Sequence, residues 1–513
     1  MVLEQIPPTI RPDHVVPVSL AVLAEQFSLE PVSGDLDCSV TGISMNTGDL
    51  RPGDLFVAMP GLKTHGAKFL EKALQLGAVA IVTDAAGLEQ LGDVSVPVLR
   101  LEAPRKHLGA LAAAVYGNRP EVMPKLFATT GTNGKTSTSY ILEAMLRQLG
   151  EVTGLTSTAE RHIAGEVIVS RLTTPESTEM QSLVARMRER EVTSIAIEVS
   201  AQALTQLRVD GLMFDVAGFT NLSHDHLDDY ADMSEYLAAK AQLFQPDRAH
   251  RGVVCLDSAF GNDFLQLSNI PTQTISLDEH KHPDFLVTVL EELPGRTKFA
   301  VRTPDAITIT SELPIIGAHM AANAGLAIVM LIQAGFTAER IQLAIADGVE
   351  CYLPGRTELV SPVGAPSIYV DFGHSPDAFL NTLAAVRKVT KGKVVMLFGA
   401  DGDRDASERP EMARVAVNGS DVLVITDHHP RFEDAASIRK TLVTAAREAK
   451  PAGEIYEVSP PEDAIIKAVS LVEPGDSILW AGPGHQDYRD IQGVRTPYSA
   501  RALAREALRN AGW

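Results

Sequence analysis

Apolar and polar positions alternate along this chain in two kinds of segment. Short runs rich in β-branched residues predict strands at residues 79–83, 125–130, 194–199, 252–256, 393–398, 421–426 and 477–480. Between them, apolar residues spaced three and four positions apart predict helices, as at residues 136–149 and 376–388. Because strands that alternate with helices form parallel sheets covered by those helices, we expect an α/β fold.

Two segments rich in proline and glycine interrupt this alternation, at residues 117–120 and 353–355. A chain of 513 residues is also too long for one hydrophobic core. We therefore predict three α/β domains, at residues 1–122, 123–353 and 354–513. Open α/β sheets bind ligands at the carboxyl ends of their strands, so motifs that follow a predicted strand are the candidate sites.

Composition narrows the class of protein. The chain is 45% apolar and 21% charged, as soluble globular proteins are. Its net charge of -20 shows none of the basic character that binding to nucleic acid requires. No segment approaches the roughly 18 apolar residues that cross a bilayer, and residues 1–17 lack the pattern of a signal peptide. We expect a cytoplasmic protein that binds neither nucleic acid nor membranes.

The three cysteines, Cys38, Cys255 and Cys351, lie far apart and have no metal-ligand spacing. This pattern is typical of free thiols in a reducing compartment. A polyanionic substrate would have to meet lysine, arginine or bound cations gathered at its site, because the overall charge repels it.

A phosphate-binding loop follows the predicted strand at residues 125–130 and opens the next helix. Glycines let backbone N–H groups curl around phosphates, and the helix N-terminus adds partial positive charge. The lysine can reach the terminal phosphates, and the threonine after it can bind Mg²⁺. Two residues, instead of the common four, separate the glycines. The predicted nucleotide contacts are Thr130, Gly131, Thr132, Asn133, Gly134, Lys135, Thr136 and Ser137.

Two side chains near other strand ends are candidate metal ligands. Glu198 ends an apolar strand, where a carboxylate is costly unless it has a partner. His226 lies in NLSHDHLD, which follows the apolar run at residues 214–220. For either residue alone, a structural role is the favoured interpretation. Together with a phosphate loop, they predict a magnesium site.

Lys240 lies on an apolar helix face with Tyr236, Leu237, Leu243 and Phe244. Such a lysine usually extends to water. If it stays buried, its pKa falls, and its neutral amine can take up CO₂. The resulting carbamate is a carboxylate surrogate that can bind Mg²⁺. The sequence leaves both alternatives open.

Eight motifs together resemble the Mur ligase family. In chain order they are TTGTNGKT, IEVS, NLSHDHLD, YLAAKAQLF, PGRTE, VDFGHSPDA, FGADGDRD and AGPGHQDY. The resemblance covers nearly the whole chain, including the N-terminal stretch that contains PGDLFVAMPG. It implies an N-terminal UDP-binding α/β domain, a central P-loop-type parallel-sheet domain that binds ATP, and a C-terminal Rossmann-like domain that binds an amino acid.

The resemblance also implies a reaction and a set of partners. ATP would convert the D-Glu carboxylate of UDP-N-acetylmuramoyl-L-Ala-D-Glu to an acyl phosphate, which a free diamino acid would then attack. Mg²⁺ would stabilise the phosphoryl charge. Closure of the C-terminal domain would exclude water from the intermediate. We expect a monomer whose cofactors are ATP and Mg²⁺.

Each implied role falls on matching residues. Lys135, His226 and Lys240 would be catalytic, and Thr136, Glu198, His226 and carbamylated Lys240 would bind the metal. Further nucleotide contacts would come from Asn323, Arg356 and Asp371. The UDP-muramoyl-dipeptide would meet Ser44, Thr47, Leu62, Lys63, Thr64, Thr173, Thr174, Ser200, Gln206 and Arg208. The amino acid would meet Arg404, His428, His429, Pro430, Arg431, Gly482 and Gln486.

Several positions depart from the family pattern. Residues 46–48 read Asn-Thr-Gly instead of Asp-Ser-Arg, residues 201–202 read Ala-Gln instead of Ser-His, and Glu408 replaces a lysine. In the amino-acid pocket, His428 and His429 replace Asp-Asn, and Gln486 replaces a glutamate. Loss of that glutamate favours L-lysine, held partly by Asp427 or another carboxylate, and both meso-diaminopimelate and ornithine stay open.

Three other functions compete with this one. A paralogous ligase could act on folate or a polyamino acid, but the stretch PGDLFVAMPG favours a muramoyl substrate. A non-catalytic nucleotide-binding scaffold would have no need for Lys135, Glu198 and Lys240 together. A simple kinase or ATPase would leave the motifs of the third domain unexplained.

Overall fold

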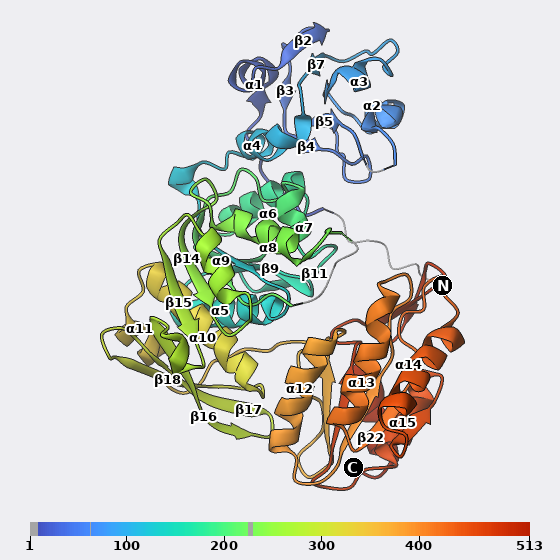
Figure 1. Cartoon of the computed structure of the whole chain (residues 1–513). Coiled ribbons are helices and arrows are strands. Elements are labelled where there is room, and N and C mark those ends of the chain that lie inside the picture. The colour runs from blue at the N-terminus through green and yellow to red at the C-terminus, as the bar shows by residue number, and fades with distance from the viewer. Residues whose placement is uncertain (1–8, 62, 224–228) are drawn as a thin grey trace.

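The computed structural model describes residues 9–61, 63–223 and 229–513, and within them three large sheets follow one another along the chain (Figure 1). Leu62 and His226, both predicted site residues, lie outside the described residues. Among the helices of the described segments, none is both long enough and apolar enough to cross a membrane.

The first sheet has five strands in the order β2-β7-β6-β5-β4. Only the β2–β7 pair is antiparallel. One core lies between the sheet and helices α1 and α4, and a second core lies on the side of α2 and α3. The strands are β2 (Glu30–Ser33), β4 (Gly42–Ser44), β5 (Asp54–Ala58), β6 (Ala80–Thr83) and β7 (Val98–Arg100), and the helices are α1 (Leu20–Phe27), α2 (Leu70–Gln75), α3 (Ala85–Leu88) and α4 (Pro104–Tyr116); the short pair β1 (Val18–Ser19) and β3 (Ser39–Val40) lies beside them.

The second sheet has eleven strands in the order β11-β10-β9-β12-β8-β13-β14-β15-β16-β17-β18. Its centre, from β9 to β16, is parallel, and antiparallel hairpins extend both edges. The strands are β8 (Lys125–Thr130), β9 (Thr153–Thr156), β10 (Glu160–Ile163), β11 (Glu166–Val169), β12 (Ser194–Glu198), β13 (Phe214–Phe219), β14 (Ala249–Cys255), β15 (Thr272–Ser276), β16 (Phe285–Leu293), β17 (Arg296–Arg302) and β18 (Thr308–Leu313).

Helices cover both faces of this central sheet (Figure 1). On one face, α5 (Lys135–Gln148), α10 (Ala318–Gln333) and α11 (Ala338–Ala344) enclose a core that includes Phe127 and Phe299. On the other face, α6 (Ser177–Glu189), α7 (Ala201–Thr205), α8 (Met233–Ala241) and α9 (Gly261–Leu267) enclose a second core. A parallel sheet buried on both faces explains why its central strands read as continuous apolar runs.

The third sheet has six strands in the order β19-β20-β24-β21-β22-β23, and only β19 is antiparallel to its neighbour. Helices α12, α13 and α14 cover one face, and α15 and α16 cover the other. The elements are β19 (Glu358–Leu359), β20 (Ser367–Asp371), α12 (Pro376–Val389), β21 (Val394–Phe398), α13 (Arg409–Gly419), β22 (Val422–Ile425), α14 (Ala435–Ala449), β23 (Glu454–Glu457), α15 (Pro461–Val469), β24 (Ser477–Ala481) and α16 (Ala500–Asn510). A hairpin of β25 (Tyr488–Ile491) and β26 (Val494–Pro497) lies between β24 and α16 in the sequence.

The α/β fold predicted from the sequence is confirmed. Each of the seven predicted strands is present, with boundaries within a few residues of those expected, and the two predicted helices are α5 and α12. The antiparallel strands at the edges of the central sheet were not predicted, because their polar residues disrupt the apolar runs. One of these edges, the β10–β11 hairpin, contributes residues to the candidate site.

Candidate functional site

The phosphate loop joins β8 to α5 with two glycines in backbone conformations that other residues rarely adopt. Gly131 has a φ of 148° and Gly134 a φ of 85°. A Cβ atom on Gly134 would lie 2.7 Å from the Asn323 side-chain oxygen, so the glycine also lets α10 approach the loop. Lys135 follows directly, and its Nζ donates to the backbone oxygen of Thr132 at 2.7 Å. The Lys135 side chain is thus folded back over the loop to which it belongs.

The segment that follows β13 forms hydrogen bonds with the phosphate loop. The Asn221 side-chain oxygen accepts from the backbone N–H of Asn133 at 2.9 Å. The Thr220 hydroxyl donates to the backbone oxygen of Asn133 at 2.6 Å, and the backbone oxygen of Asn221 accepts from Thr132 at 2.9 Å. These bonds fix the peptide groups of the loop before any ligand binds, which lowers the cost of ordering it.

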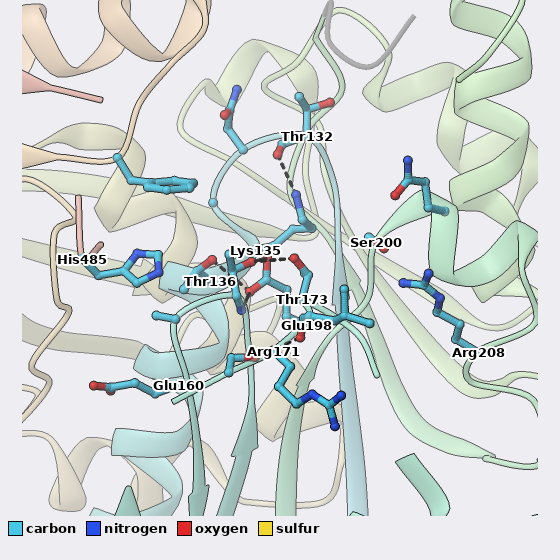
Figure 2. A pocket seen from close by; sticks show the side chains of 18 of the residues that line it. Thr132, Lys135, Thr136, Glu160, Arg171, Thr173, Glu198, Ser200, Arg208 and His485 are labelled. Atoms are coloured by element: carbon cyan, nitrogen blue, oxygen red, sulfur yellow. Dashed lines mark hydrogen bonds between the residues drawn. The ribbon is translucent and has the colours of Figure 1, made fainter. Parts of the chain in front are cut away.

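Glu198 lies at the centre of a small hydrogen-bonded group beside the loop (Figure 2). Its side chain is 2% exposed, and it accepts from the Thr136 hydroxyl at 2.9 Å. The Thr158 hydroxyl and backbone N–H donate to the same carboxylate at 3.0 and 2.8 Å. Carboxylate and hydroxyl oxygens are the ligands that Mg²⁺ prefers, so this donor set fits that ion.

Lys240 is buried, with 1% of its surface exposed, and does not extend to water. Its Nζ donates to the backbone oxygen of Gly131 at 2.8 Å and lies 4.2 Å from the centre of the Tyr236 ring. The buried alternative of the two weighed for this lysine is therefore the one observed. Whether it carries a carbamate stays a prediction.

A loop from the C-terminal sheet brings an arginine to the same place. The Arg356 Nη2 donates to the Thr136 hydroxyl at 3.2 Å, and its guanidinium lies 4.3 Å from the centre of the Phe372 ring. Burial lowers the pKa of Arg356, and the nearby Asp371 and Glu198 carboxylates oppose that shift. Asp371 itself accepts from the backbone N–H groups of Thr357 and Gly373, each at 2.7 Å, so it shapes the loop that holds Arg356.

The β10–β11 hairpin contributes Glu160 to the cavity lining and joins a charged network that the sequence did not reveal. Glu160 accepts from the Tyr140 hydroxyl at 2.7 Å, and His162 bridges Glu160 and Glu143 at 3.3 and 2.8 Å. Burial lowers the pKa of His162, but the two carboxylates outweigh it and raise the value to about 9. The hydrogen bond from His162 in turn lowers the pKa of Glu160. Figure 2 shows Glu160 and His485 on the same side of the cavity.

Residues expected to hold the muramoyl-dipeptide lie around the ends of β12 and α7. The Thr173 hydroxyl donates to the Thr158 hydroxyl oxygen at 3.0 Å, since the Thr158 proton is given to Glu198, and the Thr174 hydroxyl donates to the backbone oxygen of Glu198 at 2.9 Å. Arg208 pairs with Glu176 at 2.9 Å and donates to the Gln206 side chain at 2.7 Å. Ser200 caps α7 by accepting from Ala203.

The N-terminal sheet meets this region through Arg171, which was not predicted. Its Nη1 donates to Asp49 at 2.7 Å and to the Thr9 hydroxyl at 3.0 Å. Ser44 is buried and exchanges hydrogen bonds with the backbone of Asn46 at 2.9 and 3.1 Å. The arginine thus ties the predicted uridine side of the cavity to the central domain.

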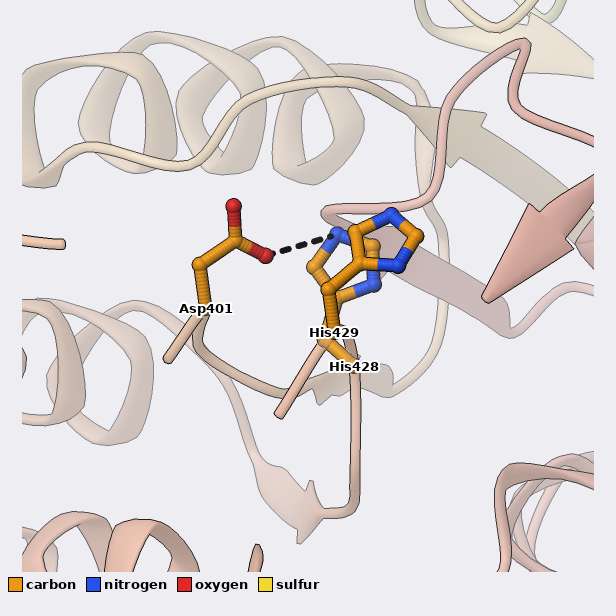
Figure 3. Close-up of side chains that lie close together, drawn as sticks. All are labelled: Asp401, His428 and His429. Atoms are coloured by element: carbon orange, nitrogen blue, oxygen red, sulfur yellow. Dashed lines mark ion pairs between the residues drawn. The ribbon is translucent and has the colours of Figure 1, made fainter. Parts of the chain in front are cut away.

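The predicted amino-acid residues gather near the ends of β21, β22 and β24. His429 joins Gln486 at 2.9 Å, and its Nδ1 accepts from the backbone N–H of Asp490 at 3.0 Å. Arg431 donates to Asp401 at 3.1 Å instead of pairing with the acidic residues that follow it in sequence. His428 is buried beside the same carboxylate (Figure 3).

Asp427, proposed from the sequence as a partner for a substrate ammonium, is already engaged. It forms an ion pair with Arg439, and the Ser459 hydroxyl donates to it at 2.5 Å. Neither Asp427 nor Asp401 lines the large cavity of the described structure, but Asp401 pairs with Arg431, which does. Asp401, from the loop after β21, is the carboxylate that adjoins the histidine pair.

One cavity of about 2130 Å³ joins these groups and reaches all three sheets. The predicted residues that line it are Ser44, Thr47, Thr64, Thr132, Asn133, Gly134, Lys135, Thr136, Ser137, Thr173, Glu198, Ser200, Arg208, Asn323, Arg356, Asp371, Arg404, His429, Arg431 and Gln486. The remaining described ones lie behind this lining or beside it: Lys63, Thr130, Gly131, Thr174, Gln206, Lys240, His428, Pro430 and Gly482.

Family models match the chain in three consecutive parts. Residues 39–116 match the Mur ligase family, catalytic domain; residues 129–331 match the Mur ligase middle domain; and residues 355–484 match the Mur ligase, glutamate ligase domain.

Named relatives match over almost the full length. A UDP-N-acetylmuramyl-tripeptide synthetase of Leifsonia xyli subsp. xyli is 50% identical over 99% of both chains. A UDP-N-acetylmuramoyl-L-alanyl-D-glutamate--2,6-diaminopimelate ligase of Streptomyces avermitilis is 40% identical over 97% of this chain and 98% of its own. A solved structure of a ligase with that second name, at 23% identity, covers 97% of this chain and all of its own with a TM-score of 0.68, which supports the fold.

Proposed function

Since the chain belongs to the Mur ligase family and is therefore an ATP-dependent ligase that forms amide bonds, we propose that it joins a diamino acid to the D-Glu of UDP-N-acetylmuramoyl-L-Ala-D-Glu. This reaction adds the third residue of the peptide precursor of peptidoglycan. The relatives named above support that step, because both are named for it.

The observation that carries the proposal is the single cavity that reaches all three sheets. The phosphate loop lies at its centre, Ser44 and Thr47 line its N-terminal end, and Arg431 and Gln486 line its C-terminal end. A ligase of this kind must hold three reactants at once, and bringing them together in one geometry contributes much of the rate acceleration. A kinase or a simple ATPase has no use for the third compartment.

In the proposed reaction, an oxygen of the D-Glu carboxylate attacks the terminal phosphorus of ATP, and ADP leaves. The amine of the diamino acid then attacks the acyl carbon, loses a proton, and releases phosphate. Lys135 of the loop itself and Arg356 from the C-terminal sheet stabilise the charge that builds on the phosphoryl oxygens. Arg208 and Ser200 orient the carboxylate that reacts.

Thr136 and Glu198 are proposed to hold Mg²⁺, with His226 and a carbamate on Lys240 completing the metal site. The ion would supply positive charge at the phosphoryl oxygens. Glu198 suits this role because it is buried and its hydrogen bonds come from uncharged groups, Thr136 and Thr158. We propose a monomeric enzyme, since one chain supplies every group named here.

The test incubates purified protein with ATP, Mg²⁺ and UDP-N-acetylmuramoyl-L-Ala-D-Glu, with L-lysine, meso-diaminopimelate or L-ornithine in separate tubes. Phosphate release and the mass of the product are recorded. Product in one tube supports the proposal and identifies the third residue. The Lys135→Ala variant is the inactive reference. Absence of product in every tube, from protein that binds ATP, would refute the proposal.

A further inference from the structure

The cluster formed by Asp401, His428 and His429 lies at the ends of two neighbouring strands (Figure 3). Asp401 follows β21, the two histidines follow β22, and one ligand atom from each lies within 4.8 Å of the others. His428 and His429 are 7% and 3% exposed. The proposed reaction steps give Asp401 no role, although it adjoins two residues that line the cavity, its ion-pair partner Arg431 and His429.

The protons of His429 argue against a metal ion in this cluster. Its Nδ1 accepts from the backbone N–H of Asp490 at 3.0 Å, so the ring proton is on Nε2. That N–H donates to the side-chain oxygen of Gln486 at 2.9 Å. Both ring nitrogens are thus engaged, and His429 offers no lone pair to a metal. Its effect is to fix the orientation of the Gln486 amide at the cavity wall.

Asp401 carries the negative charge of the cluster, and only one of its oxygens is satisfied. Arg431 donates to Oδ2 at 3.1 Å, whereas Oδ1 is buried and receives a hydrogen bond from no described residue. The His428 Nε2 lies 3.5 Å from Oδ1, beyond a good hydrogen bond. Burial lowers the pKa of His428 to about 3, so this imidazole is neutral at pH 7.

We infer that Asp401, flanked by His428, binds the distal ammonium of the incoming amino acid, an inference that rests on the proposed function. An ammonium supplies one positive charge and three N–H donors, which the Asp401 carboxylate lacks at Oδ1. Arg431 can still receive the substrate carboxylate, because a guanidinium carries five N–H donors and Asp401 engages it through Nη2.

This assignment also determines which diamino acid fits. The distal end of meso-diaminopimelate carries a carboxylate beside its ammonium, and Asp401 would repel that carboxylate when Arg431 is engaged by the α-carboxylate of the substrate and by Asp401 itself. L-lysine and L-ornithine end in an ammonium alone. The site therefore selects a diamino acid without a distal carboxylate, and the selecting residue is Asp401 instead of Asp427.

The experiment measures KM for L-lysine, meso-diaminopimelate and L-norleucine, which has the length of lysine but no distal ammonium. The full-length enzyme is compared with Asp401→Asn and with Glu411→Gln. Glu411 is an exposed residue of α13 that pairs with Arg414, so its variant makes the same change in charge away from the cavity. We expect Asp401→Asn to raise KM for L-lysine roughly tenfold or more, as expected for loss of a charged hydrogen bond. KM for L-norleucine and for ATP should stay unchanged.

A second assay separates this inference from the proposed function. Hydroxylamine traps the acyl phosphate as a hydroxamate with ATP and the muramoyl-dipeptide alone, so no amino acid is needed. No hydroxamate from the unaltered enzyme refutes the proposed function. Hydroxamate together with an unchanged ratio of the lysine and norleucine KM values in Asp401→Asn overturns the inference alone.

Two further results would also decide the matter. If Asp401→Asn forms no hydroxamate, the His428→Asn variant is tested in its place. The ratio of its KM values for L-lysine and L-norleucine then decides in the same way. One equivalent of tightly bound zinc in the purified enzyme, lost in Asp401→Asn, would overturn the ammonium assignment and make the cluster a metal site.

Discussion

The hydroxyl of Thr136 is one place where the central and C-terminal domains meet at the level of single atoms. It donates to Glu198 at 2.9 Å and accepts from Arg356 at 3.2 Å. A carboxylate and a guanidinium therefore share one uncharged oxygen, and each reduces the cost of burying the other. Phosphate or a metal ion that enters the loop must rearrange this pair. We therefore expect nucleotide binding and the position of the C-terminal domain to be coupled through Thr136.

Lys240 gives the first prediction at this scale. Replacing it with alanine removes the amine and leaves room for a small anion, so ligation should fall by at least a hundredfold if a carbamate on this lysine binds Mg²⁺. Millimolar formate or acetate should restore part of the activity by supplying the missing carboxylate. Turnover is measured with and without these anions. Full activity of the variant without any added anion would remove the lysine from the metal site.

His162 gives a prediction about pH. Its folded pKa of about 9 lies above the ordinary value of 6.5, because Glu143 and Glu160 stabilise the charged ring against burial. The stabilisation is complete below pH 6.5 and is lost as the pH rises through 9, a change of about 2–3 kcal/mol. Urea unfolding between pH 6 and 10 should show this loss in the unaltered protein but not in His162→Gln. His280→Gln, an exposed histidine of the same domain, should keep the slope.

At the scale of elements, the segment before β19 and the segment after β24 touch each other at Gly355 and Gly484. Gly355 has a φ of 61°, and a Cβ atom on it would lie 2.0 Å from the backbone carbon of Gly484. No side chain can fit there without moving one backbone away from the other. Arg356 is the next residue, so this close contact sets where the guanidinium enters the cavity.

Gly355→Ala should therefore affect both stability and catalysis. Backbone strain alone costs about 1–3 kcal/mol, and the clash with Gly484 adds to it. We expect a lower Tm and a fall in turnover of tenfold or more as Arg356 shifts. Gly364→Ala is the matched control, since Gly364 has a φ of 93° in open space. Equal effects of the two substitutions would mean that strain matters and the loop contact does not.

Helices, strands and loops are predicted well from the sequence where the residues of one short segment determine them. Continuous apolar runs such as β12 and β21 are recognisable because both faces of a parallel sheet are buried. The phosphate loop is recognisable because its turn has positive φ angles at positions 131 and 134, which favour glycine. Asp401 was missed because its partners come from another strand end, and the adjacency of β21 and β22 cannot be read from either motif.

At the scale of the whole molecule, Arg171 connects the first two sheets. It leaves the segment after β11 and donates to Asp49 at 2.7 Å, with both side chains largely buried. The backbone N–H groups of Asp13 and His14 add a second connection by donating to Glu189, each at 2.8 Å. The N-terminal sheet is thus held where its end of the cavity meets the central one.

Arg171→Ala should loosen this connection without touching the chemistry. We expect KM for the UDP-muramoyl substrate to rise roughly tenfold, the effect of one charged hydrogen bond, with kcat and KM for ATP nearly unchanged. Steady-state kinetics with each substrate varied in turn will show the separation. Arg100→Ala, which removes an exposed ion pair of the N-terminal sheet, should behave like the unaltered enzyme. A fall in kcat alone would place Arg171 in the reaction itself.

The continuity of the 2130 Å³ cavity has a consequence for inhibition. Among the described residues, no wall separates the regions proposed for nucleotide, muramoyl-dipeptide and amino acid, so one molecule can occupy two of them. When two weak binders are tethered, the second binds at the local concentration that the tether sets, which is millimolar for a short flexible link. A compound that joins an amino acid to a phosphate mimic through a spacer of the right length would therefore bind far more tightly than either half.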